Sequence, residues 1–218
     1  MKLVKGIYLP DSDTHFENVI DDKGYYQEKQ FRAALKYIPE ENRGLFIDIG
    51  AHVGLWSRMA NLNGFKELLA FEPDFDNYEC LDENLEALDG NNYLCNFALS
   101  DEEGKALLGN EKSDNSGAKS LDGEWNNDDL VMVHCFDTGF SSISHYFDLT
   151  KQILIKIDVQ GYEAKVVRGM TNFIKEYKPI IIVEQWLNGK EDLEATRYCE
   201  SLGMKVLEKV EKEVILGW

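Results

Sequence analysis

The sequence predicts an α/β protein with an open, mainly parallel sheet and helices on both faces. Short apolar runs alternate with stretches of helical periodicity, in the order strand, helix, strand, helix, strand. This order favours parallel strands joined by right-handed crossovers. In addition, the first apolar run, residues 45–49, leads into Gly50 and Gly54. A strand, a glycine turn and a helix in succession form a nucleotide-binding crevice in such sheets.

Bulk composition limits the class of protein and its partners. The 218 residues suffice for a buried core, and we expect a single domain over residues 1–218. The formal net charge of −17 repels phosphate backbones and anionic membranes, which disfavours a nucleic-acid substrate. The four cysteines lack metal-ligand spacing, and no apolar run approaches the ~20 residues that cross a bilayer. We therefore expect a cytoplasmic protein; the oligomeric state is not predicted.

The N-terminal half follows the strand and helix alternation closely. Residues 1–40 read as an arm of turns followed by a helix over 26–38, which ends before Pro39. We expect the arm, residues 1–25, to be mainly solvated, with a lid or pocket wall as the alternative. Beyond the first strand, helices are expected over 55–62 and 74–88, and strands over 68–71 and 93–97.

Residues 100–150 break the alternation and are expected to form an insertion between strands three and four. Strands at 106–108 and 130–136 flank a polar loop, residues 110–127, expected over the edge of the sheet, and a short helix follows near 140–147. The alternation then resumes with strands at 153–157 and 179–183, helices at 163–174 and 195–202, and a terminal hairpin of 204–207 and 214–216.

Three acidic residues stand at strand ends. Asp48 closes the first strand, Glu72 follows the second and Asp158 follows the fourth. Because open α/β sheets bind ligands at the carboxyl ends of their strands, we expect these acids to converge on one crevice. Glu72 follows Gly50 by 22 residues (72 − 50), about the spacing at which an acid accepts hydrogen bonds from ribose hydroxyls.

The glycine turn distinguishes between ligand classes. A dinucleotide fingerprint is G-x-G-x-x-G, whereas here His52 replaces the middle glycine between Gly50 and Gly54. Asp48 beside the turn would repel a diphosphate but suits the ammonium and sulfonium of S-adenosylmethionine, whose ribose suits Glu72. This favours a methyltransferase. The alternatives are a NAD-dependent oxidoreductase on a related sheet and a non-catalytic binding protein that keeps the cofactor fold.

Five segments carry a family resemblance. They are residues 46–54 (FIDIGAHVG), 71–73 (FEP), 98–104 (ALSDEEG), 155–163 (IKIDVQGYE) and 178–184 (KPIIIVE). In this order the chain resembles the FkbM family of S-adenosylmethionine-dependent methyltransferases over about residues 45–185. The resemblance implies a Rossmann-like seven-stranded methyltransferase sheet whose antiparallel strand comes from the C-terminal hairpin. It also implies O-methylation, less often N-methylation, of a small-molecule or glycan-like acceptor.

Two positions depart from the family pattern: Gln160 stands where glutamate is usual, and His52 where asparagine is frequent. In the expected site, the glycine turn forms the floor, Asp48 accepts from the cofactor ammonium, Glu72 holds the ribose and residues 98–99 line the adenine. The expected cofactor-binding set is Asp48, Gly50, Ala51, His52, Gly54, Glu72, Pro73, Ala98 and Leu99.

A hydroxyl acceptor must lose a proton to a group within hydrogen-bond reach. Asp158 is the first candidate for this catalytic role, Glu184 the second and His52 the third. The alternative for Asp158 is a strand-end acid that caps the next helix, and Glu163 is expected to be a first-turn acid that favours the helix dipole. Asp158 and Glu184 could ligate a divalent cation, but no third ligand has suitable spacing, so no metal site is predicted.

Overall fold

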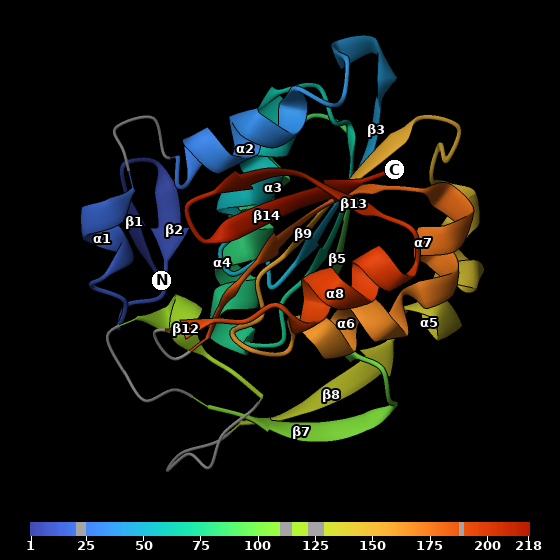
Figure 1. The fold of residues 1–218 in the computed structure, drawn as a ribbon. Helices are drawn as coiled ribbons and strands as arrows, with labels where there is room; N and C mark the ends of the chain where they lie inside the picture. The colour runs from blue at the N-terminus through green and yellow to red at the C-terminus, as the bar shows by residue number, and fades with distance from the viewer. Residues whose placement is uncertain (21–24, 110–114, 122–128, 188–189) are drawn as a thin grey trace.

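The computed structural model describes residues 1–20, 25–109, 115–121, 129–187 and 190–218. A central seven-stranded sheet has the order β13-β14-β10-β9-β3-β4-β5 (Figure 1). Its five parallel strands are β3 (Arg43–Ile49), β4 (Glu67–Phe71), β5 (Asn91–Cys95), β9 (Gln152–Ile157) and β10 (Ile180–Glu184).

The C-terminal hairpin completes this sheet. β14 (Glu213–Gly217) lies antiparallel to both β10 and β13 (Lys205–Val210). Consequently β13 runs in the same direction as the five parallel strands, and β14 alone among the seven is reversed. The predicted mixed sheet, with its antiparallel strand supplied by the terminal hairpin, is confirmed.

Helices cover both faces because successive side chains of each strand point to opposite sides. Phe46 of β3 belongs to one core, and its neighbours Leu45 and Ile47 belong to the other. The Phe46 face is covered by α2 (Glu28–Leu35), α3 (Leu55–Leu62) and α4 (Phe75–Glu86). The opposite face is covered by α5 (Phe136–Ile143), α6 (Glu163–Gly169), α7 (Thr171–Tyr177) and α8 (Glu194–Ser201) (Figure 1).

The insertion builds a second sheet in the order β6-β8-β7. Its strands are β6 (Ala98–Ser100), β7 (Gly104–Leu108) and β8 (Asp129–Cys135). β6 was not expected, because three residues are too few to display a period. The short helix begins at Phe136, four residues before the expected 140–147. The segment expected as one helix at 163–174 is two, α6 and α7, which meet at Met170.

Of the loop expected over 110–127, only residues 115–121 lie within the described part of the chain. They contain a short 3₁₀ turn, Ser116–Ala118. We call residues 115–121 the cover segment, because they contact the carboxyl ends of the strands rather than the edge of the sheet. The remaining short strands, β11 (Trp186–Leu187) and β12 (Lys190–Glu191), pair with each other.

The expectation of a mainly solvated N-terminal arm is wrong. The arm forms a hairpin of β1 (Lys2–Val4) and β2 (Ile7–Leu9), followed by α1 (Phe16–Val19). Ile7, Leu9 and Phe16 are buried in a separate core against Val53 and Leu55. These elements are three or four residues long, so their sequence displays no period from which burial could be predicted. None of the helices in the described residues is long and apolar enough to span a membrane.

Two helical glycines provide a test of the packing between α6 and the insertion. A Cβ added at Gly169 would lie 2.0 Å from the carbonyl oxygen of Ser100, whereas one at Gly139 in α5 would meet nothing within 4 Å. Gly169→Ala should therefore lower the free energy of unfolding by about 1–3 kcal/mol. Gly139→Ala, the matched control, should be neutral or stabilise by up to ~1 kcal/mol. Urea denaturation measures both, and equal effects would contradict the packing described.

Candidate active site

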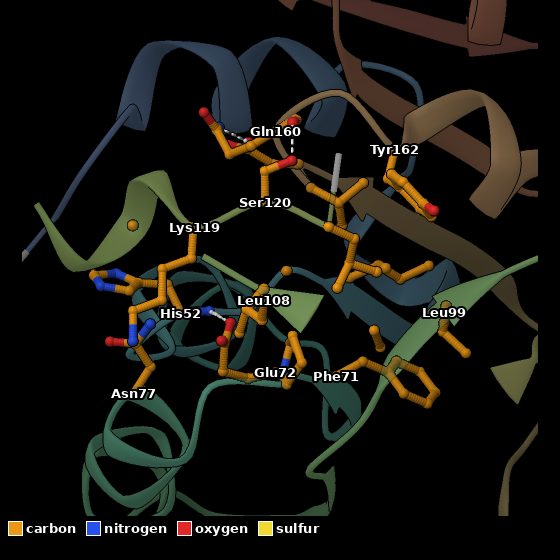
Figure 2. Close-up of a pocket in the computed structure, with 18 of the residues that line it drawn as sticks. His52, Phe71, Glu72, Asn77, Leu99, Leu108, Lys119, Ser120, Gln160 and Tyr162 are labelled. Carbon is orange, nitrogen blue, oxygen red and sulfur yellow. Dashed lines mark hydrogen bonds between the residues drawn. The ribbon is translucent and has the colours of Figure 1, made fainter. Parts of the chain in front are cut away.

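Two adjoining cavities lie at the carboxyl ends of β3, β4 and β9. The first cavity has largely apolar walls, among them Phe71, Leu99 and Leu108, and contains Glu72 (Figure 2). The second cavity, of about 310 Å³, is more polar and contains Asp48 and Glu184. The residues common to both are Gly50, His52, Gly117, Asp158 and Gln160. The acids expected to converge therefore do line one continuous region.

The expected cofactor-binding residues divide between these cavities. The first cavity is lined by Gly50, His52, Glu72, Pro73, Ala98 and Leu99, and the second by Asp48, Gly50, Ala51 and His52. Gly54 lines neither. It precedes α3 with a φ of 85°, and an added Cβ there would lie 2.7 Å from Leu81 of α4. Its role in the structure is to admit close packing of α4 against the turn.

The turn after β3 is held in a conformation that few residues adopt. Gly50 and His52 have φ angles of 75° and 53°, in the left-handed region that disfavours most side chains. A Cβ at Gly50 would lie 1.9 Å from the carbonyl oxygen of Asp158, so only glycine lets β3 and β9 approach this closely. Position 52 can carry a side chain, and asparagine tolerates the left-handed region best. Histidine occupies it here and aims an imidazole at the cavities.

Glu72 is a structural part of the turn as well as a wall of the first cavity. Its carboxylate accepts the backbone N–H groups of His52 (2.8 Å) and Asp74 (2.9 Å), the former drawn in Figure 2. Burial raises the pKa of Glu72 to about 7, against the effect of these N–H donors. Its lone pairs exceed the two hydrogen bonds in number, so the carboxylate can still accept ligand hydroxyls.

Asp48 is buried at the end of β3, where its carboxylate accepts the hydroxyl of Ser57 at 2.6 Å. Burial raises its pKa to about 6, although the Lys156 ammonium opposes this shift. Asp48 therefore carries a negative charge at neutral pH on the floor of the second cavity. That charge can attract a cationic group of a ligand.

The candidate catalytic acids form a hydrogen-bonded cluster around Lys156. The Lys156 ammonium lies 3.2 Å from one Asp158 oxygen, and the Gln160 amide donates to the other at 2.7 Å. The same amide donates to Glu184 at 3.1 Å. Asp158 is not a helix cap, since α6 begins at Glu163, its N-cap residue is Tyr162, and no side chain caps it. Asp158 therefore has no helix-capping role, and it lines both cavities, where its carboxylate can accept a proton.

The two acids of this cluster differ in protonation. Burial opposes ionisation of Asp158, but Lys156 and hydrogen bonds from Glu184 and Gln160 lower its pKa. Burial and the neighbouring Asp158 charge raise the pKa of Glu184 to about 9. At neutral pH, Asp158 is a carboxylate and Glu184 a neutral acid. Opposite shifts in two adjacent carboxyl groups are a frequent feature of acid–base sites.

Glu163 brings a third carboxyl group to this cluster, which the sequence spacing did not indicate. Ligand oxygens of Asp158, Glu163 and Glu184 lie within 4.8 Å of one another. However, the Glu163 carboxylate already accepts the backbone N–H groups of Val159 (2.9 Å) and Gly161 (3.0 Å), in accord with its expected role in the first helical turn. Asp158 and Glu184 share the Gln160 amide, so each of the three carboxyl groups has a hydrogen-bond partner within the fold.

His52 is joined to the N-terminal arm through the cover segment. Its Nε2 lies 2.6 Å from the hydroxyl of Ser116, and that hydroxyl donates to Asp13. Since the hydroxyl proton goes to Asp13, Nε2 is assigned as the donor to Ser116. Burial lowers the pKa of His52 to about 4, so the imidazole is neutral at pH 7. Asp13 and Ser116 are 103 residues apart, and nothing in the sequence indicates their pairing.

The cover segment makes further contacts across the first cavity. The Asn77 amide donates to the backbone oxygen of Ser116 at 3.0 Å, and Lys119 pairs with Asp74. The Ser120 hydroxyl donates to the Gln160 backbone oxygen at 2.8 Å. In Figure 2, His52, Asn77 and Lys119 gather on one side of the cavity and Leu99 and Tyr162 lie on the other. Of these residues, only His52 and Leu99 were expected at the site.

The raised pKa of Glu72 predicts a specific pH dependence of stability. Because its pKa is about 7 in the fold and ~4.3 when exposed, folding favours the protonated form, and this contribution is lost as pH rises from 5 to 8. The wild type should lose about 2–3 kcal/mol of unfolding free energy relative to Glu72→Gln over this range. His52 has a lowered pKa and so contributes stability that increases with pH. This contribution is the same in both proteins and cancels when they are compared.

Denaturant titrations of both proteins at pH 5, 6, 7 and 8 measure this difference. Glu103→Gln is the control that should stay flat, because the N–H of Cys135 and the His134 ring lower the pKa of Glu103, so its contribution to stability changes only below this pH range. A difference between wild type and Glu72→Gln that stays constant with pH would contradict the raised pKa.

Comparison with known proteins gives the class of this fold. The structure of methyltransferase FkbM from Methylobacillus flagellatus KT superimposes with a TM-score of 0.51 and 18% identity, over 81% of this chain and 43% of that one. The structure of precorrin-6y C5,15-methyltransferase from Geobacter metallireducens GS-15 superimposes with a TM-score of 0.52 and 13% identity, over 100% of this chain and 99% of that one. The protein thus has the Rossmann-like methyltransferase fold.

The sequence comparison identifies the family. The profile of the methyltransferase FkbM domain matches residues 48–205, and the chain belongs to this family. It is also 27% identical over 146 residues to the hexuronic acid methyltransferase AglP of Haloferax volcanii. The match covers 62% of this chain and 52% of AglP, so the chain spans about half the length of this curated relative.

Proposed function

We propose that this protein is an S-adenosylmethionine-dependent methyltransferase that methylates a hydroxyl group of a sugar-like acceptor. The observation that carries the proposal is the pair of adjoining cavities, one apolar with Glu72 in its wall and one polar with Asp48, Asp158 and Glu184. A ligand with an adenosine at one end and a cationic amino acid at the other matches this division. Family membership supports the same reading.

The residues of the first cavity suit an adenosine. The side-chain oxygen of Asn77 is buried and lacks a hydrogen-bond partner among the described residues, and a buried acceptor of this kind is costly unless a ligand donor reaches it. Adenosine supplies such donors on its ribose and amine. Glu72 would hold the ribose hydroxyls, while Pro73, Ala98 and Leu99 would pack on the adenine.

The residues of the second cavity suit the amino-acid end and the acceptor. Asp48 would accept from the cofactor ammonium, beside the floor made by Gly50 and Ala51. The cofactor, when bound, supplies a methyl group on a positively charged sulfur. Asp158 would take the hydroxyl proton of the acceptor as it attacks, and Glu184, neutral at pH 7, would add no further negative charge beside Asp158. His52, neutral and next to both cavities, would orient the cofactor.

The acceptor class rests on the relative and on the cavity. AglP is named as a methyltransferase of a hexuronic acid, which favours a carbohydrate acceptor. Trp56 and Tyr26 give the second cavity aromatic walls, and Gln27 supplies a polar group. Pockets that combine apolar walls with a few polar groups are typical small-molecule sites.

Ligand binding tests the proposal directly. S-adenosylmethionine and S-adenosylhomocysteine should each raise the melting temperature, since a ligand that binds only the folded state stabilises it. Glu72→Ala should weaken binding at least ~10-fold by calorimetry, because a hydrogen bond to a charged group contributes about 1.5–3 kcal/mol. Stabilisation by NAD instead would favour the oxidoreductase alternative and overturn the proposal. Loss of binding in Glu208→Gln, a control that lines neither cavity and pairs with the exposed Lys36, would show that the effect is unspecific.

The catalytic roles can be tested by methyl transfer. With methyl-labelled S-adenosylmethionine and a panel of hexuronic acids and neutral hexosides, Asp158→Asn should lower kcat by about 10²–10⁴-fold, the range for loss of a general base. Glu184→Gln should remove any change in rate that the wild type shows near pH 9, because Glu184 ionises there. Wild-type kcat in Asp158→Asn would rule out Asp158 as the base.

A further inference from the structure

The cover segment contributes a wall to both cavities. Ser116, Gly117, Lys119 and Ser120 line the first cavity, and Gly117 also lines the second. A ligand that occupies both cavities would therefore lie beneath residues 115–121. The position of this short segment decides how readily such a ligand enters and leaves.

One carboxylate of the N-terminal arm anchors the first residues of the cover segment, whereas Lys119 and Ser120 are held by Asp74 and Gln160. One oxygen of Asp13 accepts both the backbone N–H (2.9 Å) and the hydroxyl of Ser116. Its other oxygen accepts the backbone N–H of Phe16 at 2.8 Å. Asp13 is fully buried, and such charge-assisted hydrogen bonds are about twice as strong as neutral ones. Burial disfavours the charge, but these donors outweigh it and lower the pKa of Asp13.

Apolar contacts support the same junction. The Phe16 ring lies 4.5 Å from the His52 ring between centroids, and 5.1 Å from that of Tyr26. A Cβ added at Gly117 would lie 2.9 Å from the Phe16 ring. The arm, the cover segment and the glycine turn therefore meet, with the Ser116 hydroxyl between Asp13 and His52. The family profile begins at residue 48, so the arm lies outside the matched region.

We propose that Asp13 is a positioning residue that fixes the cover segment over the cofactor through Ser116, and so controls the rates of cofactor entry and release. This rests on the proposed function, in that the occupant of the cavities is S-adenosylmethionine or its product. Removal of the Asp13–Ser116 hydrogen bonds frees the cover segment to lift. Both the association and the dissociation rate should then increase, while the equilibrium constant changes less than either rate.

Stopped-flow measurements with S-adenosylhomocysteine test this in the full chain, without an acceptor. Asp13→Ala should raise the dissociation rate about 10-fold and the association rate several-fold. Ser116→Ala should raise both rates by smaller factors, because it removes the hydroxyl bond but keeps the backbone N–H of residue 116 on Asp13. Asp13→Asn, which keeps an acceptor oxygen, should give intermediate rates. Ser116→Ala leaves the Asp13 contact with Phe16 intact, so it tests the cover segment even where Asp13→Ala loosens the arm. Asp11→Ala is the matched control on the same arm, because Asp11 pairs with the exposed N-terminus.

The double variant Asp13→Ala/Ser116→Ala should dissociate no faster than Asp13→Ala, because Asp13→Ala already removes both Asp13–Ser116 hydrogen bonds. Additive effects, an unchanged association rate, or wild-type rates in Ser116→Ala would each overturn the inference. A wild-type protein that does not bind S-adenosylhomocysteine would instead refute the proposed function. The two failures are therefore distinguishable.

Discussion

The site depends on one buried cation. Lys156 is 1% exposed, yet the neighbouring carboxyl groups of Asp158, Glu213 and Glu184 raise its pKa despite burial. An isolated buried charge of either sign would cost several kcal/mol. Lys156 remains charged because of these acids, and Asp158 remains ionised because of Lys156. The cluster is therefore stable only as a unit, at the point where β9, β10 and β14 meet.

The carboxyl groups around Lys156 are chemically alike but differ in pKa. One ammonium cannot neutralise every neighbouring acid, so burial raises the pKa of Glu184 and that of Glu213 while Asp158 keeps its charge. Glu184 and Glu213 stand directly opposite each other on β10 and β14, where two like charges would be destabilising. Protonation of Glu184 relieves that repulsion and leaves Asp158 as the ionised member of the Asp158–Glu184 pair.

The parts predictable from sequence were those with local signals. The strand at 45–49, the glycine turn and the acids at strand ends follow from periodicity and spacing, and the structure places these elements as expected. Lys156 had a usable signal, because a lysine inside an apolar strand must find a buried acid. Asp13 and Ser116 had none: their contact joins a short arm to an irregular loop, and only the folded chain brings them together.

Two residues of the site, one in each of the turns after β3 and β9, have left-handed backbone conformations. His52 and Gln160 both have φ near 53°, at turns that follow β3 and β9. The backbone at each position shapes the crevice independently of the side chain. The two side chains make different contacts: His52 contacts Ser116, and Gln160 donates to both Asp158 and Glu184. An amide at position 160 supplies hydrogen-bond donors where a glutamate would add a negative charge to the cluster. With Gln160 in place, the one ammonium of Lys156 is sufficient to keep Asp158 ionised.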